Sequence, residues 1–187
     1  MKRRGLWLCT LAAAVLLAGC QGNMAESADR ESGYTYGTAD WVVQFDSVEQ
    51  AMEESDVCIL GTVISEEVRL IHDLYFTYYD VQAEDGTHYT VVMTGGYVDG
   101  EPQNLLMPLL EEGKTYFLCL NGQIYHDEQI YNIGGGDQGY GLYDPETGIV
   151  TAVNTGERAL FSSFEVQKGL YGYNIYNLEP AAGTEEK

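Results

Sequence analysis

The chain has few cationic residues, and this scarcity limits the partners that it can bind. Nine Lys and Arg stand against 29 Asp and Glu among 187 residues, which gives a formal net charge of −20. Nucleic-acid-binding proteins neutralise phosphates with clustered Lys and Arg, and binding to anionic lipid headgroups needs similar clusters. The composition therefore argues against nucleic acid and against direct headgroup binding.

Cysteine and histidine are also scarce, with four and three residues. Small disulfide-dependent domains are far richer in cysteine, and the chain has neither a Cys-x-x-Cys pair nor two His at i, i+4. We therefore expect no metal site and no cofactor. Cys58 and Cys119 each lie in an apolar, strand-like run. Two buried free thiols are expected there, and a Cys58–Cys119 disulfide is the alternative if their strands are neighbours.

The N-terminus carries the pattern of a secretion signal. Lys2, Arg3 and Arg4 precede an almost wholly apolar stretch from Gly5 to Leu17, and small residues follow it. Such a stretch is too short for a stable transmembrane helix, which needs about 20 apolar residues. Residues 1–19 are therefore predicted to be a signal peptide.

The residues at the predicted cleavage site, Leu17-Ala18-Gly19-Cys20, resemble the lipobox of bacterial lipoproteins. This resemblance implies that the Cys20 thiol takes a diacylglycerol and that the chain is cut just before it. Two acyl chains, palmitate among their typical components, give stable anchoring where one gives only marginal binding. We therefore expect a lipid-anchored protein on the extracytoplasmic side of the cell membrane, with the bilayer as a partner through Cys20.

Composition divides the 168 residues that follow the predicted signal peptide into three parts. Residues 20–40 are rich in Gly, Ser, Ala and acids and read as a flexible linker. Residues 41–178 are long enough for a single domain with its own core, and residues 179–187 read as a loose polar tail. Without Lys2, Arg3 and Arg4 the net charge falls to −23, which suits a soluble body held away from the bilayer by a tether.

Local patterns predict one short helix followed by strands. Ser47 and Gln50 have the spacing of a capping box, and Val48, Ala51 and Met52 form an apolar stripe, so a helix is expected over residues 47–54. Several short strands with Gly-rich turns then indicate a small antiparallel barrel or sandwich. The expected strands are 57–64, with Gly61 marking a bend or bulge, 74–82, 88–94, 115–120, one within 123–133, and a hairpin of 139–143 with 149–153.

Three segments resemble secreted lipoproteins of Gram-positive bacteria that carry an OB-like barrel. They are Ser55-Asp56-Val57-Cys58-Ile59-Leu60-Gly61-Thr62-Val63, the Gly95-Gly96-x-x-Asp99-Gly100 loop, and residues 109–118. The likeness implies a mainly β fold: a small antiparallel OB-like barrel with one short helix and an extra C-terminal hairpin. It extends distantly to netrin-like domains, whose N-terminal cysteine framework is missing here.

No set of residues matches a known catalytic arrangement. His126-Asp127-Glu128 is the densest acid–base candidate, and a loop between strands explains it equally well. Ser162-Ser163 lacks the Gly-x-Ser-x-Gly pattern of a nucleophile elbow. We therefore expect no enzyme and no catalytic residue, but a binding or accessory module for an envelope protein or glycan. The alternative is an envelope-associated hydrolase.

The strand over residues 74–82 holds the candidate partner-binding residues. Tyr75 and Tyr79 alternate along one of its faces, and Phe76 and Tyr78 along the other. A barrel interior takes one face, so the other is either covered by a neighbouring element or exposed. If exposed, it is the expected interaction surface, because aromatic side chains give large contact area at low entropic cost.

Overall fold

The fold is mainly β with one short α-helix in the part of the chain that the structure describes. The structure is a computed structural model and describes residues 44–154, 159–170 and 172–181. The predictions for residues 1–40, Cys20 included, lie outside this range. The strands are β1 (Val57–Ile71), β2 (Leu74–Ala83), β3 (His88–Thr94), β4 (Gly96–Val98), β5 (Glu101–Gln103), β6 (Thr115–Tyr125), β7 (Glu128–Ile133), β8 (Tyr140–Asp144), β9 (Ile149–Ala152), β10 (Ser163–Gly169) and β11 (Gly172–Glu179).

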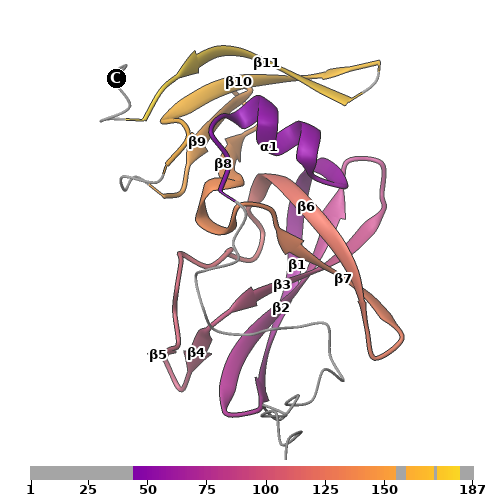
Figure 1. The fold of residues 1–187 in the computed structure, drawn as a ribbon, viewed down its shortest axis with the longest axis vertical. Coiled ribbons are helices and arrows are strands. Elements are labelled where there is room, and N and C mark those ends of the chain that lie inside the picture. Colours follow the sequence, from indigo (N-terminus) through magenta and orange to yellow (C-terminus); the bar gives the residue numbers. More distant parts are fainter. Residues whose placement is uncertain (1–43, 155–158, 171, 182–187) are drawn as a thin grey trace, which may run out of the picture. The chain divides into compact units, whose positions relative to one another are not determined.

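Nine of these strands form one large sheet in the order β1-β2-β3-β7-β6-β8-β9-β10-β11 (Figure 1). Strand β1 pairs with β6 as well as with β2, so the pairings β1-β2-β3-β7-β6-β1 close into a ring. The β3–β7 pairing is parallel, at Val91 and Tyr131. The sheet is therefore mixed, and the prediction of an antiparallel barrel was wrong on this point.

The C-terminal part contains more strands than the single extra hairpin expected from the sequence. Strands β8 to β11 extend the sheet from β6, each antiparallel to the strand before it. Glu179, predicted to begin a loose tail, is the last residue of β11. Its carbonyl accepts a hydrogen bond from the backbone N–H of Ser162 at 2.8 Å. This backbone pairing makes Glu179 part of the sheet.

Two hydrophobic cores lie on opposite faces of β1 and β6. Ile59 and Leu118 point into the first core, formed largely by the ring strands. Their neighbours Leu60 and Phe117 point into the second, formed with α1, β9 and β10. Because successive side chains of a strand face opposite ways, a strand between two cores must be apolar at every position. This explains why residues 57–60 are all apolar and why Val63 is apolar too.

The apolar sequence of residues 57–64 predicts a strand covered on both faces, and this double burial ends one residue early. Ile64 is 47% exposed, and the register between β1 and β2 shifts between Val63 and Ser65. The irregularity therefore lies after Gly61 and not at it. Gly61 has a packing role instead, since a Cβ there would lie 2.5 Å from Cγ1 of Val81.

Helix α1 (Val48–Glu54) begins where the sequence predicts. The hydroxyl of Ser47 accepts a hydrogen bond from the N–H of Gln50 at 3.1 Å. The Gln50 side-chain oxygen in turn accepts one from the N–H of Asp46 at 2.7 Å. Val48 and Ala51 are buried in the second core, so the helix is held by one apolar face.

Candidate functional site

The aromatic residues of β2 do not form an exposed row. Phe76, Tyr78 and Tyr79 are buried, and Tyr75 is half-buried. Tyr79 points into the first core, and the guanidinium carbon of Arg69 lies 4.1 Å from the ring centroid of Tyr78. The sequence predicted a partner-binding surface here only if one face of the strand was exposed. Phe76, Tyr78 and Tyr79 do not meet this condition.

The acid–base candidate His126-Asp127-Glu128 lies at a hairpin turn. The single strand expected within residues 123–133 is in fact the end of β6, a turn at His126 and Asp127, and β7. Both turn residues have positive φ, 46° and 66°, as a tight two-residue hairpin turn requires. His72 and Asp73 repeat the same dipeptide and similar positive φ values between β1 and β2. Geometry thus gives both dipeptides a turn-forming role.

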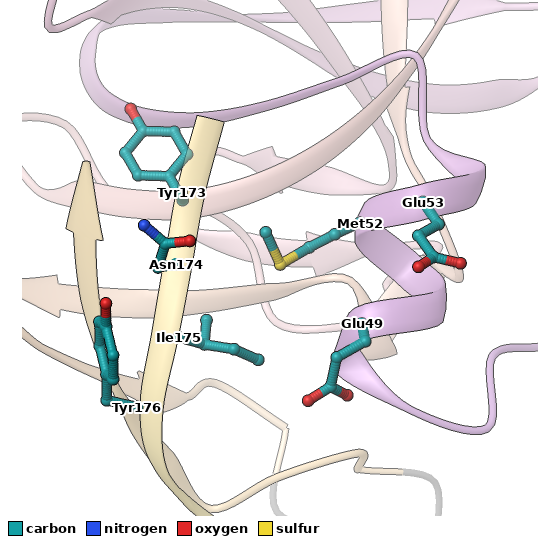
Figure 2. Close-up of a pocket in the computed structure, with 7 residues that line it drawn as sticks. All are labelled: Glu49, Met52, Glu53, Tyr173, Asn174, Ile175 and Tyr176. Atoms are coloured by element: carbon teal, nitrogen blue, oxygen red, sulfur yellow. The ribbon is translucent and has the colours of Figure 1, made fainter. Parts of the chain in front are cut away.

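An open groove lies between α1 and β11 (Figure 2). Its volume is about 350 Å³. Figure 2 shows Met52 and Ile175 extending into the space between helix and strand. Two carboxylates and no cation are among its lining residues, which are Glu49, Met52, Glu53, Tyr173, Asn174, Ile175 and Tyr176.

The helix side of the groove follows from the spacing of residues in α1. Val48 and Ala51 face the second core, which leaves Glu49 and Glu53, one turn apart, exposed on another face. Met52 is half-buried between the two faces and packs against the core from its edge. The helix therefore presents an apolar floor with two carboxylates beside it.

The strand side of the groove is a sheet edge. Within the described residues β11 pairs with β10 alone. The N–H of Val166 donates to Gly148 at 3.0 Å, on the β9 side of β10, so the pair Val166–Ile175 does not exchange backbone hydrogen bonds within the hairpin. The N–H and C=O of Ile175 consequently point outward, away from β10.

The first part of β11, Gly172 to Tyr176, lacks the usual protection of a sheet edge. Exposed edge strands commonly carry charges, Pro or bulges that prevent pairing with another chain. No charge, Pro or bulge occurs from Gly172 to Tyr176, and Tyr176 is 46% exposed. A bulge follows at Asn177, whose φ is 51°, and Glu179 ends the strand. The stretch from Gly172 to Tyr176 can therefore accept a further strand.

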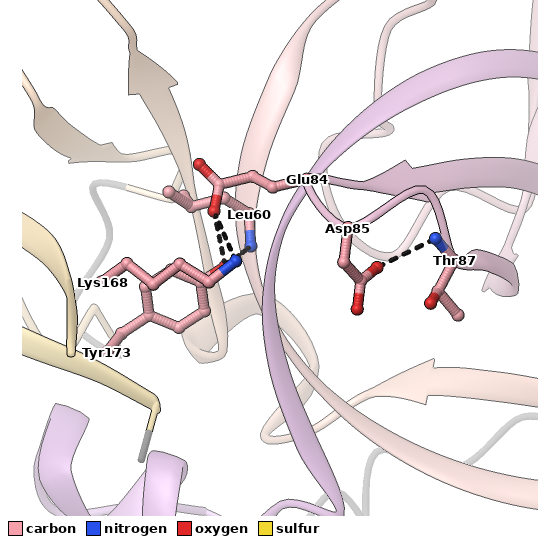
Figure 3. A network of polar contacts seen from close by, with 6 residues as sticks. All are labelled: Leu60, Glu84, Asp85, Thr87, Lys168 and Tyr173. Carbon is pink, nitrogen blue, oxygen red and sulfur yellow. Dashed lines mark hydrogen bonds and ion pairs between the residues drawn. The ribbon is translucent and has the colours of Figure 1, made fainter. Parts of the chain in front are cut away.

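A polar network attaches β11 to the ring of strands (Figure 3). The N–H of Leu60 in β1 donates to the Tyr173 hydroxyl at 3.0 Å, and that hydroxyl donates to the Glu84 carboxylate at 3.4 Å. Lys168 forms an ion pair with the same carboxylate oxygen at 3.3 Å. Burial raises the pKa of Tyr173, and the negative charge of Glu84 raises it further. The edge strand is thus fixed in place close to the groove.

Neither β11 nor the groove was predicted from the sequence. A strand was indicated by Tyr173, Ile175 and Tyr176, which have good strand propensity, whereas Asn174 does not. Proximity of α1 and β11, which are more than 100 residues apart in the chain, could not be read from any local pattern.

No family model, curated protein or solved structure matches the chain. The described residues contain no group of three or more His, Cys, Asp or Glu that could hold a metal ion. A search of these same residues for a helix long and apolar enough to cross a membrane found none.

Proposed function

We propose that this protein is a non-enzymatic binding module of the cell envelope that captures an extended, basic peptide segment of a partner protein. The observation that carries the proposal is the unprotected outer edge of β11 beside the acidic groove. In this proposal, Cys20 carries the diacylglycerol that holds the body on the extracytoplasmic face of the membrane.

The ring of strands supports an OB-like barrel as the scaffold. In the OB fold, five strands close into a small, partly open Greek-key barrel. Here β1, β2, β3, β7 and β6 pair in a closed order, and the one parallel pairing joins β3 to β7. We propose that these five strands are the barrel and that β8 to β11 are an extension carrying the binding edge.

Binding by strand addition follows from the direction of the backbone groups. An extended peptide that pairs with a sheet edge gains main-chain hydrogen bonds, and pockets for its alternate side chains supply specificity. The outward N–H and C=O of Ile175 offer such hydrogen bonds. The apolar surface of Met52 and Ile175 then receives one side chain of the incoming strand.

Charge selects the class of partner. Glu49 and Glu53 line the groove without a cation among the lining residues, and the whole chain carries a net charge of −20. A Lys or Arg on the incoming strand therefore gains attraction both locally and at long range, whereas an acidic strand is repelled. The partner that fits is an extended segment that presents an apolar and a basic side chain on the same face, two positions apart, toward α1.

Binding of synthetic peptides to the full chain tests this proposal. We expect a short peptide in which Val and Lys alternate at every second position, with Thr between them, to bind, and its counterpart with Glu for Lys not to bind, by isothermal titration calorimetry. Added salt should weaken binding, since exposed charges are screened. Glu49→Gln/Glu53→Gln should weaken it about tenfold or more, as expected for losing two charge contacts. Glu101→Gln/Glu146→Gln removes two exposed carboxylates elsewhere and should leave affinity almost unchanged.

Variants at Ile175 separate backbone pairing from side-chain contact. Ile175→Pro removes the outward N–H, and Pro is tolerated on an edge strand when that N–H faces solvent. Ile175→Ala removes the same apolar contact but keeps the N–H. Binding that is lost in the Pro variant and retained in part by the Ala variant supports strand addition. Equal binding of the basic and acidic peptides, or no binding of either, would contradict the proposed function.

A further inference from the structure

Cys58 and Cys119 face each other across the antiparallel pair β1–β6. They are direct register partners, and their sulfur atoms lie 3.0 Å apart. The N–H of Cys119 donates to Gly139, and its carbonyl accepts from the N–H of Gly134, so both backbone groups point away from β1. The pair is therefore a non-hydrogen-bonded one, the kind in which opposed Cα atoms are closest, at about 4.5 Å.

This position suits a covalent link between the strands. A disulfide joins Cα atoms about 4.4–6.8 Å apart, so β1 and β6 already stand within the range that the bond requires. The link would join two strands of the closed ring at residues 61 positions apart in the sequence.

The two thiols differ in their accessibility. Cys119 is 1% exposed, whereas Cys58 is half-buried, and its sulfur lies 3.9 Å from the carbonyl oxygen of Met52 in α1. An external reagent therefore reaches Cys58 first. The contact between the thiols lowers the pKa of Cys58 and raises that of Cys119, which burial raises further.

We propose that Cys58 and Cys119 form a disulfide by exchange with an external disulfide, with Cys58 as the attacking thiol. The Cys58 thiolate attacks one sulfur of the reagent, expels the other half as a thiolate, and becomes a mixed disulfide. Cys119 then loses its proton and attacks the Cys58 sulfur, which releases the second half. The two cysteines are oxidised by two electrons, the reagent is reduced to two thiols, and the two thiol protons pass to them.

This inference is independent of the proposed peptide binding, because it needs only the two sulfurs and an oxidant of the disulfide class. The test uses oxidised and reduced glutathione as the redox pair. The full chain carries Cys9→Ala and Cys20→Ala, so that Cys58 and Cys119 are its only thiols. After equilibration at several glutathione ratios, the protein is quenched with acid, unfolded and alkylated with N-ethylmaleimide.

Intact mass and peptide mapping then give the result. We expect two maleimides at the reducing end. At the oxidising end we expect none, a mass lower by two hydrogen atoms, and a Cys58–Cys119 cross-linked peptide. Two maleimides or two glutathione adducts at the most oxidising ratio would overturn the proposal. The maleimide count and the peptide map need no substitution of Cys58 or Cys119, so the result does not depend on whether such a variant folds.

Single variants test the order of attack. Cys119→Ser should accumulate one glutathione on Cys58, because no second thiol displaces it. Cys58→Ser should stay unmodified while folded, because Cys119 is buried. A glutathione adduct on Cys119 in folded Cys58→Ser, with none on Cys58 in folded Cys119→Ser, would overturn the assignment of Cys58 as the attacking thiol.

Discussion

The hydroxyl oxygen of Tyr173 accepts a hydrogen bond from the backbone N–H of Leu60 at 3.0 Å, across 113 positions of sequence. Leu60 is buried in the second core, and the Tyr173 ring packs edge-on against Phe117, with ring centroids 5.9 Å apart. One side chain therefore both satisfies a buried backbone donor of β1 and holds the β10–β11 hairpin against the ring of strands.

Tyr173→Phe should destabilise the fold while keeping the ring contact with Phe117. The N–H of Leu60 would lose its acceptor in a buried position, and an unsatisfied buried donor costs about 1–3 kcal/mol. We expect the free energy of unfolding in urea to fall by that amount. Glu84→Gln keeps the Leu60–Tyr173 bond and serves as the control, with a much smaller effect because the Lys168–Glu84 pair is exposed.

Tyr79→Phe should have the opposite effect. Its hydroxyl is buried, and although it lies near Thr77 and the backbone of Leu110, it forms no well-aligned hydrogen bond within the described residues. Removing a buried, unsatisfied polar group recovers part of its desolvation cost, about 1 kcal/mol. Urea unfolding should give a higher midpoint for this variant than for the parent chain. A clear loss of stability would show that the hydroxyl is hydrogen-bonded in solution.

Alkaline pH should destabilise the fold through tyrosines that are buried or half-buried. Burial raises the pKa of five tyrosines above their ordinary value of 10.0; these are Tyr78, Tyr79, Tyr89, Tyr116 and Tyr173. A raised folded-state pKa means that their contribution to stability is complete below about pH 10 and is lost as pH rises through the folded values. Urea unfolding at a series of pH values, followed with tyrosinate absorbance, should show this decline. Tyr79→Phe should make the decline shallower.

Cys20→Ala should abolish lipid anchoring if the lipobox resemblance holds. Radiolabelled palmitate should then label the parent chain, and the Cys20→Ala chain should stay unlabelled and either unprocessed or released from the membrane. Cys9→Ala is the matched control, because Cys9 lies inside the predicted signal and its loss should leave labelling intact. Labelling of the Cys20→Ala chain would refute the prediction.

Local signals predicted the elements that depend on local chemistry. Ser47 and Gln50 marked the start of α1 because a cap involves residues three apart. The strand over residues 88–94 was predicted at its observed bounds, since it has strong strand propensity and follows the Gly86 turn.

A loop between strands was one interpretation of His126-Asp127-Glu128, and the β6–β7 hairpin confirms it. The exact two-residue turn was not predicted, because such turns usually contain Asn-Gly or Asp-Gly. Features that depend on distant neighbours were not predictable. Gly139 gave no local signal for its role, which is that a Cβ there would clash with the carbonyl oxygen of Gly134. Such close backbone approach is a property of the folded loop alone.

Strand β6 pairs with β1, β7 and β8, and this central position has a consequence for the speed of folding. Strand β1 gains its second partner only after the chain has been made through residue 120, and β6 itself is fully paired only after β8 has followed. Pairings of such high sequence separation close slowly, because loop entropy is lost before any contact forms. As the chain emerges N-terminus first, the apolar residues 57–63 of β1 therefore stay without their β6 partner for much longer than a hairpin needs to form. During this interval an exposed, unpaired apolar strand can aggregate.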